Sequence, residues 1–248
     1  MGRTWVHAAL EVKSRFLIDL RVGPRTRALA VALVTSVAVC CLGPVFPLLL
    51  IDDHLPYPAA ILQVFGLIQH RRRRRGRGRK RHPRLKPPPG LWVGVVKKVR
   101  DTRGNLVKVT RHALFGRRSD IEQRIRQLGI GTRIHAAHLE RCNGTLRTQQ
   151  SSRLGRRTRN GSRRTALLSC ALWLWRDLYN WTRVHGSLAG RTPAMALGLA
   201  RQVWTVLSYV RHPVHVSDLQ RDIWAEERNA AQESALDHYF RKKVLPIS

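Results

Sequence analysis

Carboxylates are scarce in this chain, so the side chains that could bind a metal ion can be named one by one. Only 15 of the 248 residues are Asp or Glu, against 46 Lys and Arg. Glu11 and Asp52 each follow an apolar segment typical of a strand, and carboxylates at strand ends can hold metal ions at the rim of a sheet. Two magnesium ions about 4 Å apart, held in this way, catalyse phosphodiester chemistry. The alternative stays open, because acids in so basic a protein also serve in salt bridges.

The net charge points to a polyanionic partner. The formal charge is +31, and a compact state with that charge repels itself unless a polyanion neutralises it. Most of the basic residues are Arg, whose guanidinium group contacts phosphate through two parallel hydrogen bonds. The composition therefore predicts a nucleic-acid partner, while a generic basic surface of the ribosomal type remains an alternative.

Cysteine spacing and hydropathy indicate in which cellular compartment the protein is found. Cys40, Cys41, Cys142 and Cys170 lack C-x-x-C spacing, which disfavours a structural zinc site or a disulfide framework and indicates a reduced, cytosolic protein. The uncharged run 28–51 is long enough to span a bilayer, but Gly and Pro residues interrupt it and two Asp follow. We therefore expect a buried helix and then a buried strand, with a membrane-associated basic protein as the less favoured alternative.

Hydrophobic periodicity predicts an α/β domain with a central sheet. The first half should hold two hairpin strands, a helix, a fully buried strand and a second helix, over 4–10, 15–22, 26–41, 46–51 and 59–65. The second half should hold a hairpin and four helices, over 91–99 with 105–114, then 119–128, 136–150, 166–181 and 217–241. Ser119 should cap the first of these helices, and the aromatic residues of 166–181 favour a packed core over a base-stacking platform.

Two segments are too basic to pack. Residues 71–86 contain eleven Lys or Arg and no acid, and residues 153–164 contain six Arg and no acid. Such composition predicts a mobile arm that only phosphate would order.

Two motifs in the second half resemble those of a known family. Residues 140–147, Glu-Arg-Cys-Asn-Gly-Thr-Leu-Arg, match the pattern E-R-x-N-x-x-x-R, and residues 179–194 match Y-N-x-x-R-P-H-x-S-L-x-G-x-T-P-A except that Val184 replaces the Pro. Together they resemble the end of the catalytic domain of bacterial insertion-element transposases of the DDE class. Residues 5–26 and 50–60 resemble the earlier strands of that domain, so the likeness covers most of residues 5–200.

The resemblance implies a fold and a division of the chain. The fold is α/β, an RNase H-like mixed central sheet flanked by helices, with a long basic loop and a helical C-terminal tail. Residues 1–66 would form the first part of the core, and 67–90 a basic flexible insertion. Residues 91–200 would complete the core, and 201–248 would be a helical extension.

The resemblance also implies the site. The three metal-binding, catalytic acids of the family fall on Glu11, Asp52 and Glu140, with Asp53 as an alternative to Asp52. Glu11 departs from the family, which has Asp there, and the added methylene displaces a carboxylate that magnesium requires in near-ideal octahedral geometry. Four further residues would bind nucleic acid: Asn143, Arg147, Arg183 and His185. Of these, we expect Arg183 and His185 to be structural or DNA-positioning.

The implied function is DNA transposition, by cleavage and strand transfer that depend on two Mg or Mn ions. Partners would be double-stranded DNA at the element ends and the target, with no small-molecule substrate, and a homodimer is one assembly open to the chain. The location would be cytoplasmic, on the nucleoid. Glu11 stands where the family has Asp, and the chain begins close to the first core strand. These two features suggest a truncated or degenerate copy of a transposase. An active enzyme is favoured, and a non-catalytic DNA-binding remnant is the main alternative.

Overall fold

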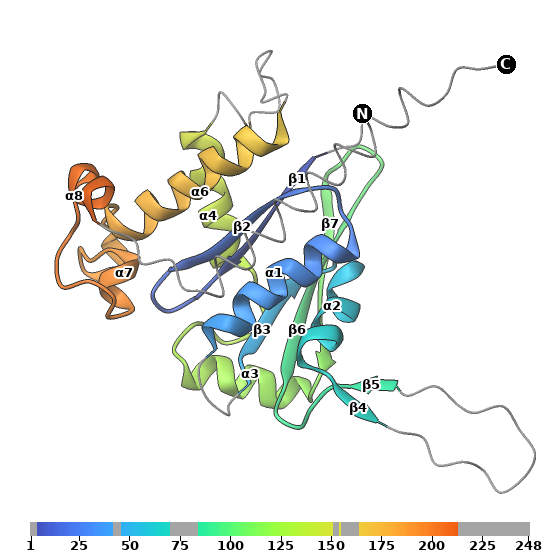
Figure 1. Cartoon of the computed structure of the whole chain (residues 1–248). Helices are drawn as coiled ribbons and strands as arrows, with labels where there is room; N and C mark the ends of the chain where they lie inside the picture. The colour runs from blue at the N-terminus through green and yellow to red at the C-terminus, as the bar shows by residue number, and fades with distance from the viewer. Residues whose placement is uncertain (1–3, 42–45, 70–83, 151–153, 155–163, 213–248) are drawn as a thin grey trace, which may run out of the picture. The chain divides into compact units, whose positions relative to one another are not determined.

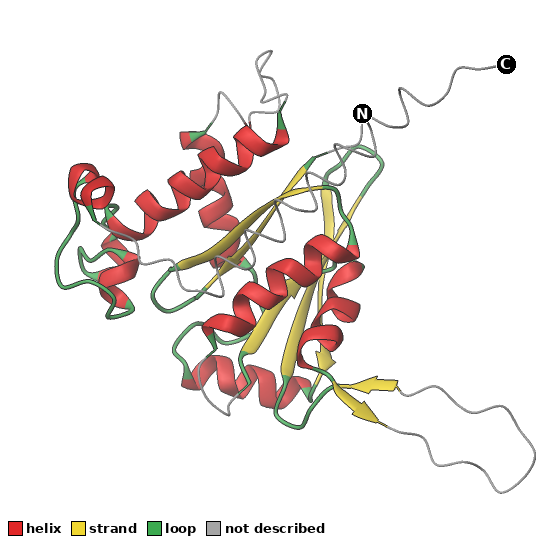
Figure 2. Cartoon of the chain, viewed as in Figure 1, coloured by secondary structure: helices red, strands yellow, loops and turns green. Residues whose placement is uncertain are grey.

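The strands in the described residues form three small sheets, and helices pack against the two larger structures, the N-terminal two-stranded hairpin and a three-stranded sheet. The computed structural model describes residues 4–41, 46–69, 84–150, 154 and 164–212. The chain divides into two units, residues 1–206 and 207–248, and the elements below belong to the first unless stated. The mixed α/β class predicted from the sequence is confirmed (Figure 2).

A two-stranded antiparallel hairpin opens the chain. Strand β1 (Trp5–Leu10) pairs with β2 (Leu17–Gly23), close to the predicted bounds. Strand alternation gives β1 two different faces. Val6, Ala8 and Leu10 pack into a hydrophobic core, and the residues between them face the other way.

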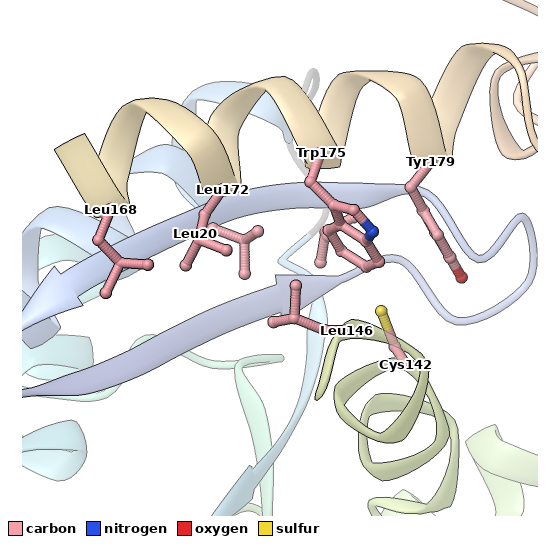
Figure 3. Close-up of a cluster of buried hydrophobic side chains, with 8 residues drawn as sticks. Leu20, Cys142, Leu146, Leu168, Leu172, Trp175 and Tyr179 are labelled. Atoms are coloured by element: carbon pink, nitrogen blue, oxygen red, sulfur yellow. The ribbon is translucent and has the colours of Figure 1, made fainter. Parts of the chain in front are cut away.

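That core joins the hairpin to helices α4 (Ala137–Gln149) and α6 (Thr165–Trp181) (Figure 3). The α6 side chains point toward the hairpin and α4, as a helix with apolar residues at intervals of three and four requires. The expectation that the aromatic residues of this helix serve the core is confirmed by buried Trp175 and Tyr179. We call β1, β2, α4 and α6 the hairpin layer. Its buried residues are Leu17, Leu20, Cys142, Leu146, Leu168, Leu172, Trp175 and Tyr179.

Polar bonds fix the register of α6 on β2. The Asn180 amide, 1% exposed, accepts from the Leu17 N–H at 2.8 Å and donates to the Leu17 carbonyl at 2.9 Å. The Trp173 indole N–H donates to the Leu20 carbonyl at 2.8 Å. These bonds join residues more than 150 positions apart and satisfy backbone groups of β2 that its single partner strand leaves unpaired.

The second sheet has the order β3-β6-β7 (Figure 1). Strand β3 (Leu48–Asp52) runs parallel to β6 (Trp92–Arg100), and β7 (Leu106–Phe115) runs antiparallel to β6. Helices α1 (Arg27–Cys40) and α2 (Pro56–Phe65) pack on one face. Helix α3 (Arg118–Gln127) packs on the other. We call these six elements the sheet layer.

Two local predictions are wrong. Strand β3 is half-buried rather than fully buried, because it is the first strand of its sheet and pairs only with β6. Ser119 is not the N-cap of α3: the helix begins one residue earlier, with Arg117 at the cap, and the Ser119 hydroxyl hydrogen-bonds the Asp120 carboxylate at 2.9 Å.

The ends of the first basic segment are ordered, which corrects part of the expected flexible insertion. Strand β4 (Leu67–Gln69) pairs antiparallel with β5 (Arg84–Lys86) in a short ribbon. Pairing of backbone groups is indifferent to side-chain charge, so a basic composition did not preclude it. Residues 70–83, most of 153–164 and all of 217–241 lie outside the described residues.

The remaining elements are short: a 3-10 turn η1 (Gly186–Leu188), α7 (Pro193–Ala196) and α8 (Val206–Arg211), of which α8 belongs to the second unit from its second residue on. No helix in the described ranges is long and apolar enough to cross a membrane. Helix α1, within the run considered for that role, has 14 residues.

Candidate functional site

One cavity gathers residues from segments far apart in the sequence. Its volume is about 1180 Å³, and its wall includes β1, β3 and the beginning of α4. The predicted metal ligands Glu11, Asp52 and Glu140 all line it, and so do Asn143 and Arg147. Asp52 and Glu140 are 88 positions apart in the sequence, so only the fold brings them to one cavity.

The Glu11 carboxylate is engaged with its own turn. It accepts from the Lys13 N–H at 3.0 Å and from the Ser14 N–H at 2.6 Å, and the Ser14 hydroxyl also donates to it. These bonds satisfy backbone donors in the turn between β1 and β2. Glu11 thus has a structural function at the position where the family has Asp.

The other acids of the cavity, Asp52, Asp53 and Glu140, have different surroundings. Asp52 ends β3 and lines the cavity, and desolvation by the surrounding protein raises the pKa of its carboxyl group. Two lysines of β6 hold the neighbouring acids. Lys98 pairs with Glu140 at 2.5 Å, and Lys97 pairs with Asp53 at 2.9 Å. Asp52 is therefore the acid with the least compensation, because no ion pair is found for it among the described residues.

The three acids offer the oxygen ligands that a divalent ion needs, but their side chains do not form one compact group. Carboxylate oxygens are the ligands that magnesium and manganese prefer. Among the described residues, no group of three or more His, Cys, Asp or Glu side chains lies close enough together to hold a metal ion. Glu11 would have to leave its turn, and Glu140 would have to leave Lys98, before the three acids could share an ion.

A cluster of rings stands beside Asp52, and the sequence did not single it out. The rings of His7 on β1 and His54 lie 5.2 Å apart, and Tyr57 contacts His54 at 5.0 Å. Burial, the neighbouring His54 and Arg25 lower the pKa of His7 to about 4, so this ring is neutral near pH 7. The Nε2 atoms of both histidines are buried without a hydrogen-bond partner in the described part of the chain.

Strand alternation could have identified His7. Val6, Ala8 and Leu10 are the core face of β1, so His7 must share the opposite face with the position of Glu11. His54 could have been noticed because it directly follows two Asp residues. Lys98, by contrast, carries no sequence signal, since its contact with Glu140 depends on how α4 packs near the end of β6.

Arg183 and His185 do not line this cavity. The His185 ring packs edge-on against Tyr179, with ring centres 4.9 Å apart, and its backbone forms a bridge with Arg191. Thr192, fully buried, caps α7 by accepting from the Met195 N–H at 3.2 Å. Asn180 is bonded to β2, so much of the motif at 179–194 stabilises the hairpin layer. This agrees with a structural role for His185, which is one of the two roles expected for it.

Comparison of the chain with models of protein families, with curated proteins and with solved structures found no match.

Proposed function

We propose that this chain is a DDE-class transposase with an RNase H-like core, which cleaves and transfers DNA strands using Mg or Mn ions. The observation that supports it best is the shared cavity of Glu11, Asp52 and Glu140, which Asn143 and Arg147 also line. A charge of +31 suits a polyanionic substrate. Two divalent ions in such a site would activate the attacking oxygen and stabilise the leaving oxygen.

The position of each residue suggests its role. Asp52, desolvated and without an ion pair in the described ranges, would be the principal ligand. Glu140, Asn143 and Arg147 follow one another at intervals of three and four on α4, so they share one helix face. That face would place a carboxylate ligand and a phosphate-binding guanidinium side by side. Lys98 would neutralise Glu140 until an ion does so.

A second candidate is a non-catalytic DNA-binding protein that keeps the same fold. The bonds of the Glu11 carboxylate to Lys13 and Ser14 favour it, because they commit this acid to the turn rather than to an ion. An Asp at position 11 would be shorter by one methylene and would make that turn geometry harder to reach. The two candidates therefore differ in what the Glu11→Asp variant does.

Nicking of supercoiled plasmid in Mg or Mn buffer separates the candidates. The transposase proposal predicts nicking that Asp52→Asn and Glu140→Gln each lower by about 100-fold or more, while Asp120→Asn, on α3 and away from the cavity, retains full activity. Nicking equally strong in all variants would overturn the proposed site. No nicking by the parent chain or by Glu11→Asp, together with unchanged DNA binding, would establish the non-catalytic candidate.

A further inference from the structure

The distal half of the β6–β7 hairpin extends beyond the helices that cover the rest of the sheet (Figure 2). Residues 91 and 93–96 are buried, whereas every residue from 97 to 108 is exposed. A hydrophobic sheet normally has at least one face covered, so twelve consecutive exposed residues in a paired ribbon mark a surface that protein packing does not use. We call residues 97–108 the distal hairpin.

The charge of the distal hairpin is strongly positive. Its sequence, KKVRDTRGNLVK, contains five basic residues and a single acid. That acid, Asp101, is used within the turn, where it accepts from the Asn105 N–H at 2.7 Å and from the Asn105 side-chain amide at 3.0 Å. Lys97 and Lys98 are ion-paired at the base, but no ion pair is found for Arg103 or Lys108 within the described ranges.

The turn is held in a fixed conformation. The Arg100 guanidinium donates to the Gly104 carbonyl at 2.8 Å, and Asp101 and Asn105 are also joined through their backbones at 3.0 Å. Gly104 has φ +86, a conformation that glycine adopts without steric cost. The ribbon therefore presents its side chains without first having to order its tip, which lowers the entropy lost on binding.

Apolar side chains stand among these charges. Val99, Leu106 and Val107 are 40%, 50% and 66% exposed. The pairing steps from Val99↔Lys108 to Arg100↔Leu106, so Val107 is the extra residue of a β-bulge. Bulges twist a ribbon and redirect a side chain, and they are frequent where a strand has a function other than pairing.

We propose that the distal hairpin binds duplex DNA by entering the major groove, with Arg103 and Lys108 on phosphates and Val107 against base edges. A two-stranded ribbon fits the B-form major groove, and thymine presents an apolar methyl group there. The major groove of A-form RNA is too deep and narrow for side chains to read, so the geometry selects DNA. This inference rests on the proposed function only in taking DNA as the substrate.

Fluorescence anisotropy of a labelled 20-base-pair DNA duplex, titrated with the full chain over a range of salt, tests the phosphate contacts. Arg103→Ala with Lys108→Ala should weaken binding by at least about tenfold at 0.1 M salt and reduce the slope of log K against log salt by about 1.8, because each phosphate contact contributes about 0.9. The control pair, Arg117→Ala with Arg126→Ala at the two ends of α3, removes the same charge. Equal effects of the two pairs would overturn the proposal, since they would reflect net charge alone.

Methylation of guanine N7 by dimethyl sulfate tests the groove, because that atom lies in the major groove. The parent chain should protect N7, and Val107→Ser, which leaves the charge unchanged, should lose most of that protection. Equal affinity for an RNA duplex of the same sequence, or N7 reactivity unaltered by the parent chain, would overturn the proposal. Neither measurement requires strand cleavage, so a catalytically silent chain would still give a clear result. Far-UV circular dichroism of each variant distinguishes loss of contact from loss of fold.

Discussion

Both layers have an apolar core, and the hairpin layer adds hydrogen bonds from helix side chains to strand backbone. In the hairpin layer, α6 is fixed to β2 by hydrogen bonds from Asn180 and Trp173 to strand backbone. In the sheet layer, fully buried Ile61, Ile121 and Ile125 pack against the strands through apolar contact. Hydrogen bonds specify one register, whereas apolar packing tolerates exchange among side chains of similar volume. The hairpin layer should therefore be the more sensitive to substitutions that conserve volume.

The layers also meet at a polar centre. Asp19 on β2, 4% exposed, accepts from the Ser36 hydroxyl of α1 at 2.6 Å and pairs with the Arg21 guanidinium at 2.6 Å. Arg176 on α6 reaches the same carboxylate at 3.8 Å. Acid residues in this basic chain thus serve structure as well as the candidate site, as the salt-bridge interpretation of the sequence anticipated.

Removing volume from the sheet layer should have the largest effect on stability. Ile61→Ala deletes a fully buried side chain between α2 and the sheet, and the cavity that remains should lower the free energy of unfolding by about 4 kcal/mol. Urea denaturation measures the change. Ile121→Leu, which conserves volume, should cost less than about 1.5 kcal/mol. A larger cost for the leucine variant would show that packing in this layer is as specific as in the other.

Replacing Asn180 by Leu, again followed by urea denaturation, tests the hydrogen bonds of the hairpin layer. The number and branching of side-chain heavy atoms are conserved, but the Leu17 N–H and carbonyl both lose their partner, which should cost about 3 kcal/mol. Asn105→Leu, at the exposed hairpin turn, is the control and should cost about 1 kcal/mol or less. If Asn180→Leu proved neutral, the contrast between the layers would fail.

Acid pH should weaken the contact between His7 and His54. The folded-state pKa of His7, about 4, lies below its unfolded value of 6.5, so the unfolded chain binds more protons between these values and stability falls as pH falls. From this residue we expect a loss of about 2 kcal/mol between pH 7.5 and pH 5. Urea titrations at both pH values give the measurement, and His7→Phe should flatten the dependence. An unchanged slope in that variant would assign the effect to other groups.

The smallest effect concerns a single bond in the hairpin layer. Trp173→Phe removes the indole N–H that donates to the Leu20 carbonyl, and it should lower stability by about 1 kcal/mol. Thermal unfolding followed by circular dichroism detects such a change. Trp181→Phe, whose ring packs on Trp204, provides the comparison. Equal losses in both variants would mean that ring volume, and not the hydrogen bond, is responsible.

Much of the fold could be predicted from the sequence, whereas the arrangement of the site could be predicted only in part. Alternation and breakers located β1, β2, β6 and β7 within two residues, because each strand has a strong period and clear ends. The positions of Glu11 and Asp52 at strand ends suggested a site, and the resemblance added Glu140; the structure shows that all three line one cavity. The bonds of Glu11 within its turn were not anticipated, since they depend on how the 11–16 turn closes.

The contacts of the site that went unpredicted depend on tertiary packing. Lys98 meets Glu140 only because β6 ends near α4, and His7 meets His54 only because β1 passes close to the end of β3. Local sequence contains no information on either approach. The same holds for Asn180, whose motif suggested DNA chemistry and whose side chain instead bonds to the backbone of β2.

Equilibrium binding of Mn ions, followed by electron paramagnetic resonance, tests whether Asp52 and Glu140 bind a divalent ion in their shared cavity. We expect a saturable Mn signal in the full chain that Asp52→Asn abolishes and that Lys98→Met strengthens by several-fold, because Glu140 is then released. Mn binding that is absent from the parent chain, or that is insensitive to Asp52→Asn, would contradict this proposal.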